Sequence, residues 1–216
     1  MYLTQIYLNP RKRQVRNEIA NRYELHRTVM SLFPEKLSAS ERVLFRLEED
    51  TYEKMECYRL LLQSETQPDL TPLIQKQLNL LEPQVKEFDP VLARGTKYVF
   101  KLRVNPVFKK TRPGKLSQKM AIMENEKQIA WLQKRLGDGG ASLLGANISQ
   151  KEWLSGSLHR NDDLDGPQAH ELKIYTVLFE GTLRIEYPDK MAGCLKNGIG
   201  SAKAFGCGLL SLARMQ

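Results

Sequence analysis

Cysteine is scarce in this chain of 216 residues, and its three copies, Cys57, Cys194 and Cys207, lie far apart. A disulfide framework needs paired cysteines, and a cysteine-based metal site usually shows a short Cys-x-x-Cys spacing. Neither pattern is present, so the sequence excludes small domains that are cross-linked in either way. Scattered thiols are typical of reducing compartments, and we therefore expect a cytoplasmic protein.

Long apolar runs are also missing. No stretch approaches the roughly 18 consecutive apolar residues of a membrane-spanning helix. The amino-terminal sequence MYLTQIYLNPRKRQ lacks the apolar core of a secretory signal, so we expect neither a signal peptide nor contact with a membrane.

Histidine is equally rare, with only three copies. His159 and His170 lie in a polar stretch without the cysteine or carboxylate spacing of a metal-ligand set, and we expect them at the surface. The sequence therefore predicts no metal site and no bound cofactor.

Positive charge is abundant and unevenly distributed. The formal net charge is +8, at a sequence pI of about 9.4. Segment 97–135 holds eleven Lys or Arg against two Glu, and segment 11–27 holds six against two, which leaves the other residues net acidic. Two concentrated basic segments favour binding of a polyanion such as a nucleic acid. The alternative is two solvated basic faces without a partner.

The first ninety residues predict alternating strands and helices. The expected strands cover residues 2–8, 42–48, 57–63 and 80–88. One helix follows Asn21, and a short one begins near Pro72 and runs over residues 71–78. This order of strand, helix, strand, strand, helix, strand is that of the ferredoxin-like, or RRM-like, unit.

The same order recurs in the second half of the chain. The expected strands cover residues 97–104, 172–179, 182–187 and 208–212, and the helices cover residues 124–136 and 188–196. Glu180-Gly181 predicts the turn of a hairpin between the two middle strands. Residues 105–123 are basic and rich in turn formers, which predicts a hairpin or flexible arm. Residues 139–170 are rich in Gly, Ser, Asn and Asp and predict a loop insertion.

We therefore predict an α+β fold with two tandem ferredoxin-like βαββαβ domains. The first covers residues 1–90 and carries the candidate active site. The second covers residues 95–216 and carries the basic hairpin and a glycine-rich loop. The linker lies around residues 89–94.

The most chemically suggestive stretch begins at Asn21 and ends at Pro34. Asn21 is a good amino-terminal cap, and Pro34 cannot continue a helix. Tyr23 and His26 are three residues apart and therefore share one helix face near its positively polarised start, a site that favours a phosphate. Beside Arg27, this pair is suited to acid–base chemistry on a phosphodiester. The alternative is that His26 only packs in the core.

A second unusual stretch, residues 197–208, holds four glycines: Gly198, Gly200, Gly206 and Gly208. Glycine permits positive φ angles and close approach of another backbone, as a phosphate-binding loop requires. The spacing matches neither a dinucleotide fingerprint nor a Walker A loop. Turn glycines without a ligand are the alternative.

Several motifs together resemble a known family. They are MYLT at the start, Y-x-x-H-R-T followed by F-P, L-R-x-N-P before the basic hairpin, E-K-Q-I-A-W-L-Q-K-R-L, L-F-E-G-x-L, and the terminal G-I-G-x-A-K-x-x-G-C-G-L-L-S-L. In this order they resemble the CRISPR-associated CasE family, the repeat-processing endoribonucleases of type I-E systems. The resemblance runs from Met1 to about Ala213 and weakens across residues 139–170.

The resemblance implies two tandem ferredoxin-like domains and a metal-independent endonuclease. This enzyme would cut CRISPR repeat RNA at the 3′ base of a stem-loop, leaving a 2′,3′-cyclic phosphate and a 5′-hydroxyl. It would then keep its product as a subunit of a larger RNA-guided complex. The family's catalytic pair falls on Tyr23 and His26, with Arg27 in a supporting role.

For RNA binding we expect contacts from the basic arm and the terminal loop. The candidates are Lys109, Lys110, Arg112, Lys115, Lys119, Gly198, Gly200, Lys203, Gly206 and Gly208. Trp131 and Trp153 are aromatic surfaces on which bases could stack, although Trp131 lies on the apolar face of its helix. The competing hypothesis is a non-catalytic RNA-binding or assembly subunit built on the same two domains. The aromatic strand motif by which RRM domains stack bases is absent, which weakens that hypothesis.

Overall fold

The computed structural model describes the backbone of residues 1–112, 115–162 and 166–215, and the side chains of these residues outside 111–116 and 158–171. The chain divides into two compact units. The first comprises residues 1–90, 154–174 and 203–206, and the second comprises residues 91–153, 175–202 and 207–216. Among the described residues, no helix combines the length and apolar character needed to cross a bilayer.

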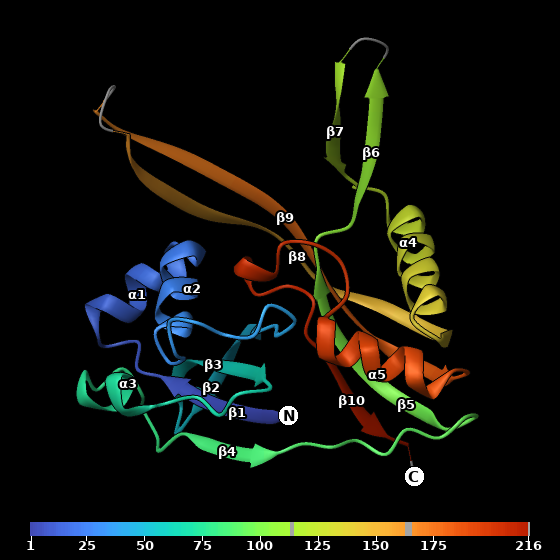
Figure 1. Cartoon of the computed structure of the whole chain (residues 1–216), viewed down its shortest axis with the longest axis horizontal. Helices are drawn as coiled ribbons and strands as arrows, with labels where there is room; N and C mark the ends of the chain where they lie inside the picture. Colours follow the sequence, from blue (N-terminus) through green and yellow to red (C-terminus); the bar gives the residue numbers. More distant parts are fainter. Residues whose placement is uncertain (113–114, 163–165, 216) are drawn as a thin grey trace. The chain divides into compact units, whose positions relative to one another are not determined.

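The first unit is built on a four-stranded antiparallel sheet in the order β2-β3-β1-β4 (Figure 1). Its strands are β1 (Tyr2–Leu8), β2 (Leu44–Tyr52), β3 (Met55–Ser64) and β4 (Gln84–Glu87). Its helices are α1 (Arg13–Ala20), α2 (Arg22–Met30) and α3 (Thr71–Gln75), with α1 and α2 in contact. The short 3₁₀ helix η1 (Lys203–Phe205) also belongs to this unit.

Apolar periodicity explains how α2 is anchored. Leu25 and Val29 are four residues apart and fully buried, so one face of α2 joins the core formed with Ile6 of β1 and Leu62 of β3. Burying side chains of this kind stabilises a fold by about 1.5–3 kcal/mol each. His26, which lies between these two residues in the sequence, is partly buried at the edge of this face.

The second unit contains another four-stranded sheet, in the order β10-β5-β9-β8. Its elements are β5 (Lys97–Val104), α4 (Asn125–Asp138), β8 (Ala141–Asp162), β9 (Gly166–Ile185), α5 (Pro188–Asn197) and β10 (Leu210–Arg214). The core of this unit includes Leu132 of α4, Leu195 of α5 and Phe179 of β9. The predicted α+β fold with two sheets is confirmed, and both sheets are antiparallel where their register is defined.

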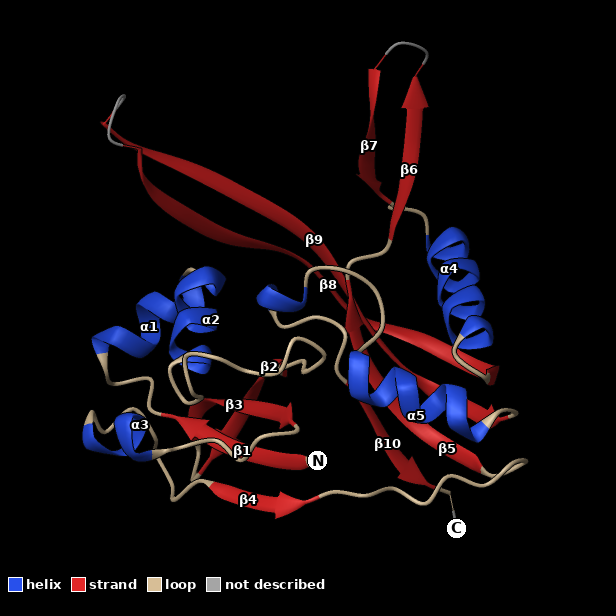
Figure 2. Ribbon diagram, viewed as in Figure 1, coloured by secondary structure: helices blue, strands red, loops and turns tan. Residues whose placement is uncertain are grey.

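The basic arm is a two-stranded ribbon formed by β6 (Val107–Arg112) and β7 (Lys115–Ala121). Figure 2 shows it extending away from α4 and from the sheet of its own unit. At its base, the Ile122 N–H donates to Pro106 O at 2.9 Å, and Gln128 Nε2 of α4 donates to Ile122 O at 2.7 Å. The prediction of a hairpin over residues 105–123 is confirmed, although residues 113–114 lie outside the described part.

The predicted turn at Glu180-Gly181 is wrong. These residues lie within β9, which pairs with β5 without interruption from Val177 to Arg184. A Cβ on Gly181 would lie 2.1 Å from Gly145 O. Glycine is therefore required there for the close approach of another backbone segment, which produces the same sequence signal as a turn.

The predicted loop insertion over residues 139–170 is also wrong. Most of it is the long strand β8, which neighbours β9 in the sheet, and Ser149 Oγ donates to Leu178 O at 3.2 Å. Few of its described side chains are buried, so the strand lacks the apolar alternation that identifies a half-buried strand. The side chains of His159 and His170 lie outside the described part of the structure.

Residues 13–20 form a helix, α1, that the sequence did not predict. Only Val15 and Glu18 are buried in it. A helix of eight residues spans only about two turns, too few to establish a period, and polar or charged residues occupy five of its eight positions.

Candidate active site and nucleic-acid interface

The start of α2 is held by Asn21, which caps the helix as predicted. Its Oδ1 accepts hydrogen bonds from the Tyr23 N–H at 3.2 Å and from the Ser157 N–H at 3.1 Å. The first bond satisfies one of the free N–H groups of the first turn. A Cβ on Gly156 would lie 3.4 Å from Cβ of Tyr23, so β8 passes directly against this turn. The position of Tyr23 is therefore fixed by both α2 and β8.

The imidazole of His26 stacks on the ring of Phe45 in β2, with centroids 6.1 Å apart and planes inclined by 16°. Nδ1 is buried without a hydrogen-bond partner among the described residues, whereas Nε2 is not buried in this way. Burial lowers the pKa of His26 from its usual 6.5, because desolvation penalises the charged imidazolium. The ring is therefore neutral at pH 7, and Nε2 is the nitrogen open to a substrate.

The terminal glycine segment supports this arrangement. Gly206 has a φ of +80°, and a Cβ there would lie 3.1 Å from Cε2 of Phe45. A side chain at this position would press on the ring that supports His26. Residue 206 and residue 26 therefore belong to one site, a connection that the sequence resemblance did not reveal.

Lys203 adds a cation to the same unit. It begins η1, which contacts both α2 and β2. Burial, followed by the positive charge of Arg42, lowers the pKa of the Lys203 ammonium. A partly desolvated ammonium interacts more strongly with a phosphate than one in bulk water does. Lys203, expected to bind RNA, thus lies in the unit that carries Tyr23 and His26.

Arg27 is placed differently from the other predicted site residues. Its guanidinium is exposed and forms an ion pair with Glu24, with 3.1 Å between Nη1 and Oε2. It lines a pocket of about 620 Å³ together with residues of α1, and neither Tyr23 nor His26 contributes to that pocket. A substrate phosphate would therefore compete with Glu24 for this guanidinium.

The four predicted RNA-binding glycines have clear structural roles. Gly198, Gly206 and Gly208 each donate their amide N–H to a backbone carbonyl, at 2.8, 3.0 and 2.8 Å respectively. A Cβ on Gly200 would lie 3.2 Å from Cη2 of Trp131. Three of the four therefore do not offer an unoccupied N–H to a phosphate, and RNA binding by this segment stays a prediction.

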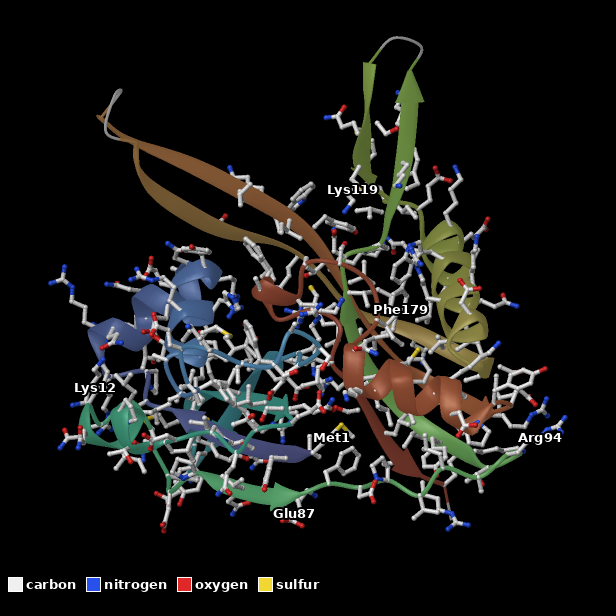
Figure 3. The ribbon with its side chains drawn as sticks, viewed as in Figure 1. Met1, Lys12, Glu87, Arg94, Lys119 and Phe179 are labelled. Carbon is white, nitrogen blue, oxygen red and sulfur yellow. The ribbon has the colours of Figure 1, made fainter. Side chains whose placement is uncertain are left out.

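The arm displays lysines on both of its faces. Lys109 lies opposite Lys119 in the β6–β7 register, and Lys110 lies opposite Gln118. All three lysines are exposed, and Figure 3 labels Lys119 in the half of the ribbon closer to α4. The backbones of Arg112 and Lys115 are paired, whereas their side chains lie outside the described part.

Both tryptophans lie in the second unit. Trp131 is partly buried against the core and receives a cation–π contact from Arg135, whose Cζ lies 5.3 Å from the ring centroid. Trp153 is 56% exposed and packs against Tyr175, with centroids 5.2 Å apart. Trp131, which the sequence places on the apolar face of its helix, is therefore partly buried and also lines a pocket.

Sequence reasoning missed Phe45, Gly156 and Ser157, which position the predicted catalytic pair. A phenylalanine in a strand and a glycine or serine in a polar stretch carry no local sign of such a role. Within the described residues, no three His, Cys, Asp or Glu side chains gather as a possible metal site.

Comparisons with known proteins identify the family of the chain. Residues 1–214 match a family described as CRISPR associated protein. The CRISPR-associated endoribonuclease Cse3 of Thermus thermophilus is 35% identical over 221 residues, covering 99% of this chain and all of the relative. The Cascade subunit CasE of Escherichia coli K12 is 32% identical over 202 residues, covering 88% of this chain and 91% of the relative.

A solved structure of Thermus thermophilus Cse3, bound to an RNA that represents a pre-cleavage complex, superimposes with a TM-score of 0.81. It is 32% identical and covers 98% of each chain. The similarity thus extends over the whole fold as well as over the motifs. The chain belongs to the Cse3/CasE family of CRISPR-associated endoribonucleases.

Proposed function

We propose that this protein cleaves the stem-loop RNA of a CRISPR repeat at the 3′ base of the hairpin, without a metal ion. The products would be a 2′,3′-cyclic phosphate and a 5′-hydroxyl. The observation that carries the proposal is a neutral His26 stacked on Phe45, in the same helix as the fixed Tyr23. The full-length similarity to a CRISPR endoribonuclease supports the same substrate.

In this mechanism the RNA supplies its own nucleophile. Nε2 of His26 removes the proton from the 2′-hydroxyl, whose oxygen attacks the adjacent phosphorus while the bond to the 5′-oxygen breaks. A neutral imidazole suits a general base, and general acid–base catalysis contributes typically about 10²–10⁴-fold to a rate. Holding the 2′-oxygen in line with the leaving oxygen supplies a further part of the acceleration.

The remaining groups act on the nucleophile, the phosphate and the leaving group. Tyr23 orients the 2′-hydroxyl or donates a proton to the departing 5′-oxygen, since a phenol O–H can both accept and donate a hydrogen bond. Lys203 faces the negative charge that develops on the phosphorane. Arg27 supports the phosphate in competition with Glu24.

The arm binds the stem. Side chains read the deep, narrow major groove of A-form RNA poorly, so lysines that follow the phosphates are the suitable contacts. Lys109, Lys110 and Lys119 are exposed for contacts with RNA phosphates, and Arg112 and Lys115 continue the series toward the tip, where the stem would lie. Because a solved relative holds RNA and the Escherichia coli relative is a Cascade subunit, we infer that this protein retains its guide RNA within an RNA-guided complex.

We also assign each sheet, with its helices, to a ferredoxin-like domain. In both units the strand that comes first lies between the third and fourth, and the second strand is at an edge. This order is the one expected for a βαββαβ chain with two crossover helices. The domain limits 1–90 and 95–216 and the cytoplasmic location stay predictions.

The proposal is tested by incubating the protein in EDTA with a hairpin RNA of its repeat. A matched RNA carries a 2′-deoxy substitution at the nucleotide before the scissile bond. We expect cleavage of the first RNA, with a cyclic phosphate end, and none of the second. Tight binding of both RNAs without cleavage of either would instead identify a non-catalytic RNA-binding subunit.

A further inference from the structure

A pocket of about 330 Å³ lies within the second unit, where the arm meets α4. Its lining includes Lys109, Lys119, Trp131, Arg135, Gly200 and Ser201. Its volume is at the lower end of the range for small-molecule sites, about 300–1,000 Å³. A duplex is too wide for such a pocket, whereas a single extruded nucleotide is not.

The walls of this pocket are fixed by contacts that do not depend on a ligand. Ser201 forms an isolated bridge with Asn105, and their side-chain oxygens Oγ and Oδ1 are 3.1 Å apart. Gly200, at a φ of +83°, lies against the indole of Trp131. The base of the arm is tied to α4 through Gln128. The pocket is therefore preformed, so a ligand would not have to order it.

The charges in the pocket are all positive. Lys109 and Lys119 occupy directly opposed positions in the ribbon, and Arg135 adds a third cation. Like charges directly opposite each other destabilise a strand pair, and none of the lining residues is an Asp or Glu that would compensate. An anionic group between the lysines would remove this repulsion.

The same pocket offers a planar surface. Arg135 lies over the Trp131 ring at 5.3 Å, so a guanidinium supported by an indole forms part of the wall. Proteins that bind unpaired RNA stack bases on aromatic rings and on guanidinium planes. A planar, cation-backed surface next to an anion site is the combination that one nucleotide requires. An acidic peptide would use the cations and leave the planar surface without a partner.

We propose that this pocket binds a single unpaired nucleotide of the hairpin RNA. Its base stacks on the Arg135–Trp131 pair, and its phosphate lies between Lys109 and Lys119. This inference rests on the proposed function, because it takes the RNA to be the repeat hairpin. It adds a second recognition point at the base of the arm, independent of the duplex that the rest of the arm contacts.

The test uses the full-length protein and hairpin RNAs in which 2-aminopurine replaces one unpaired nucleotide at a time. We expect the fluorescence of one position to be quenched on binding, because stacking quenches this base. Arg135→Lys keeps the charge but removes the plane, and we expect it to abolish the quenching and weaken binding about tenfold. Lys134→Ala, an exposed neighbour that does not line the pocket, should match the wild type.

A second RNA separates the pocket from the arm. For a hairpin trimmed of all unpaired end and bulge nucleotides, the wild type and Arg135→Lys should bind equally well. Quenching that is the same in both proteins, or an equally large drop in affinity with the trimmed hairpin, would overturn the proposal. The proposal would also be overturned if an acidic peptide bound to the pocket without reversing the fluorescence quenching at any 2-aminopurine position. Absence of cleavage by the wild type in EDTA would refute the proposed function instead, and the quenching assay does not depend on cleavage.

Discussion

In the first unit, the chain between the first strand of the sheet and the following core helix forms α1. At the same point in the second unit, between β5 and α4, the chain forms the basic arm. The sheets have the same strand order, and both inserted segments are basic, but one is a helix and the other is a two-stranded ribbon. The first unit places Tyr23 and His26 in its core helix, whereas the second exposes lysines on a ribbon. We propose that one arrangement of strands supports chemistry in one copy and electrostatic binding in the other.

The largest effect is expected from His26→Ala. It removes the proposed base, so the single-turnover cleavage rate should fall by about 10²–10⁴-fold while hairpin affinity changes little. Lys127→Ala, an exposed residue in the first turn of α4, is the control in the other unit. A wild-type rate for His26→Ala would place the chemistry elsewhere. Tyr23→Phe should reduce activity less if the phenol only orients the nucleophile, whereas an equal reduction would assign it a proton transfer.

The next largest effect is expected from changing Lys109, Lys110, Lys115 and Lys119 together to Ala. Each phosphate contact that the substitutions remove should flatten the log–log salt dependence of RNA binding, by about 0.9 in the case of duplex DNA. Affinity measured over a salt series should therefore drop most at low salt, and cleavage at saturating protein should suffer far less. An unchanged slope would mean that the arm does not follow RNA phosphates.

Gly206→Ala should act on stability and catalysis together. Its backbone lies in the left-handed region, where a side chain costs about 1–2 kcal/mol, and the new methyl group would press on Phe45. Thermal melting and cleavage should both show a decrease. Gly193→Ala is the control, since a Cβ there meets nothing within 4 Å and alanine favours the helix by up to about 1 kcal/mol. Equal melting of the two variants would contradict the close packing at residue 206.

The smallest effect concerns pH. Burial lowers the pKa of His26, so its proton is lost at a lower pH in the folded protein than in the unfolded chain. The unfolded chain therefore binds more protons below about pH 6.5, and the stability tied to the neutral ring is lost as pH falls through the folded pKa. The cleavage rate should decrease over the same acidic pH range, which gives the pH–rate profile an acidic limb.

Phe45→Leu tests the cause of that limb. It admits water beside the imidazole, so the limb should move toward pH 6.5, whereas Phe100→Leu in the second unit should leave it in place. An identical pH profile for all three proteins would show that the Phe45 stack does not set the pKa.

The sequence predicted those parts of the fold that have local signals. The preference of asparagine for the first position of a helix is local, so Asn21 could be identified as a cap from the sequence. The alternation of buried and partly exposed residues in β1 likewise identifies a strand without knowledge of the strands that pair with it. Gly181 was misread, because a turn and a close backbone approach select the same residue. β8 was not predicted as a strand because most of its residues are polar. Its pairing with β9 holds it in the sheet, and its own sequence shows no alternation of apolar residues.

The proposed catalytic pair, Tyr23 and His26, rests on spacing and on family resemblance, but its surroundings were not predicted. Phe45 supports His26 from a strand, and Gly206 reaches that strand from almost the other end of the chain. Contacts over such separations depend on the tertiary fold, and residue types alone do not specify them.

The composition of the first unit has a consequence for synthesis of the protein. Residues 154–174 and 203–206 belong to the same compact unit as residues 1–90. In the sequence, however, residues 91–153 and 175–202 of the second unit separate these three segments. A nascent chain that ends before Gly206 lacks the segment that packs on Phe45. Such long-range contacts form late, because loop closure must precede them. The ribosome must therefore synthesise residues 1–206 before Gly206 can pack on Phe45 and complete the proposed nuclease site.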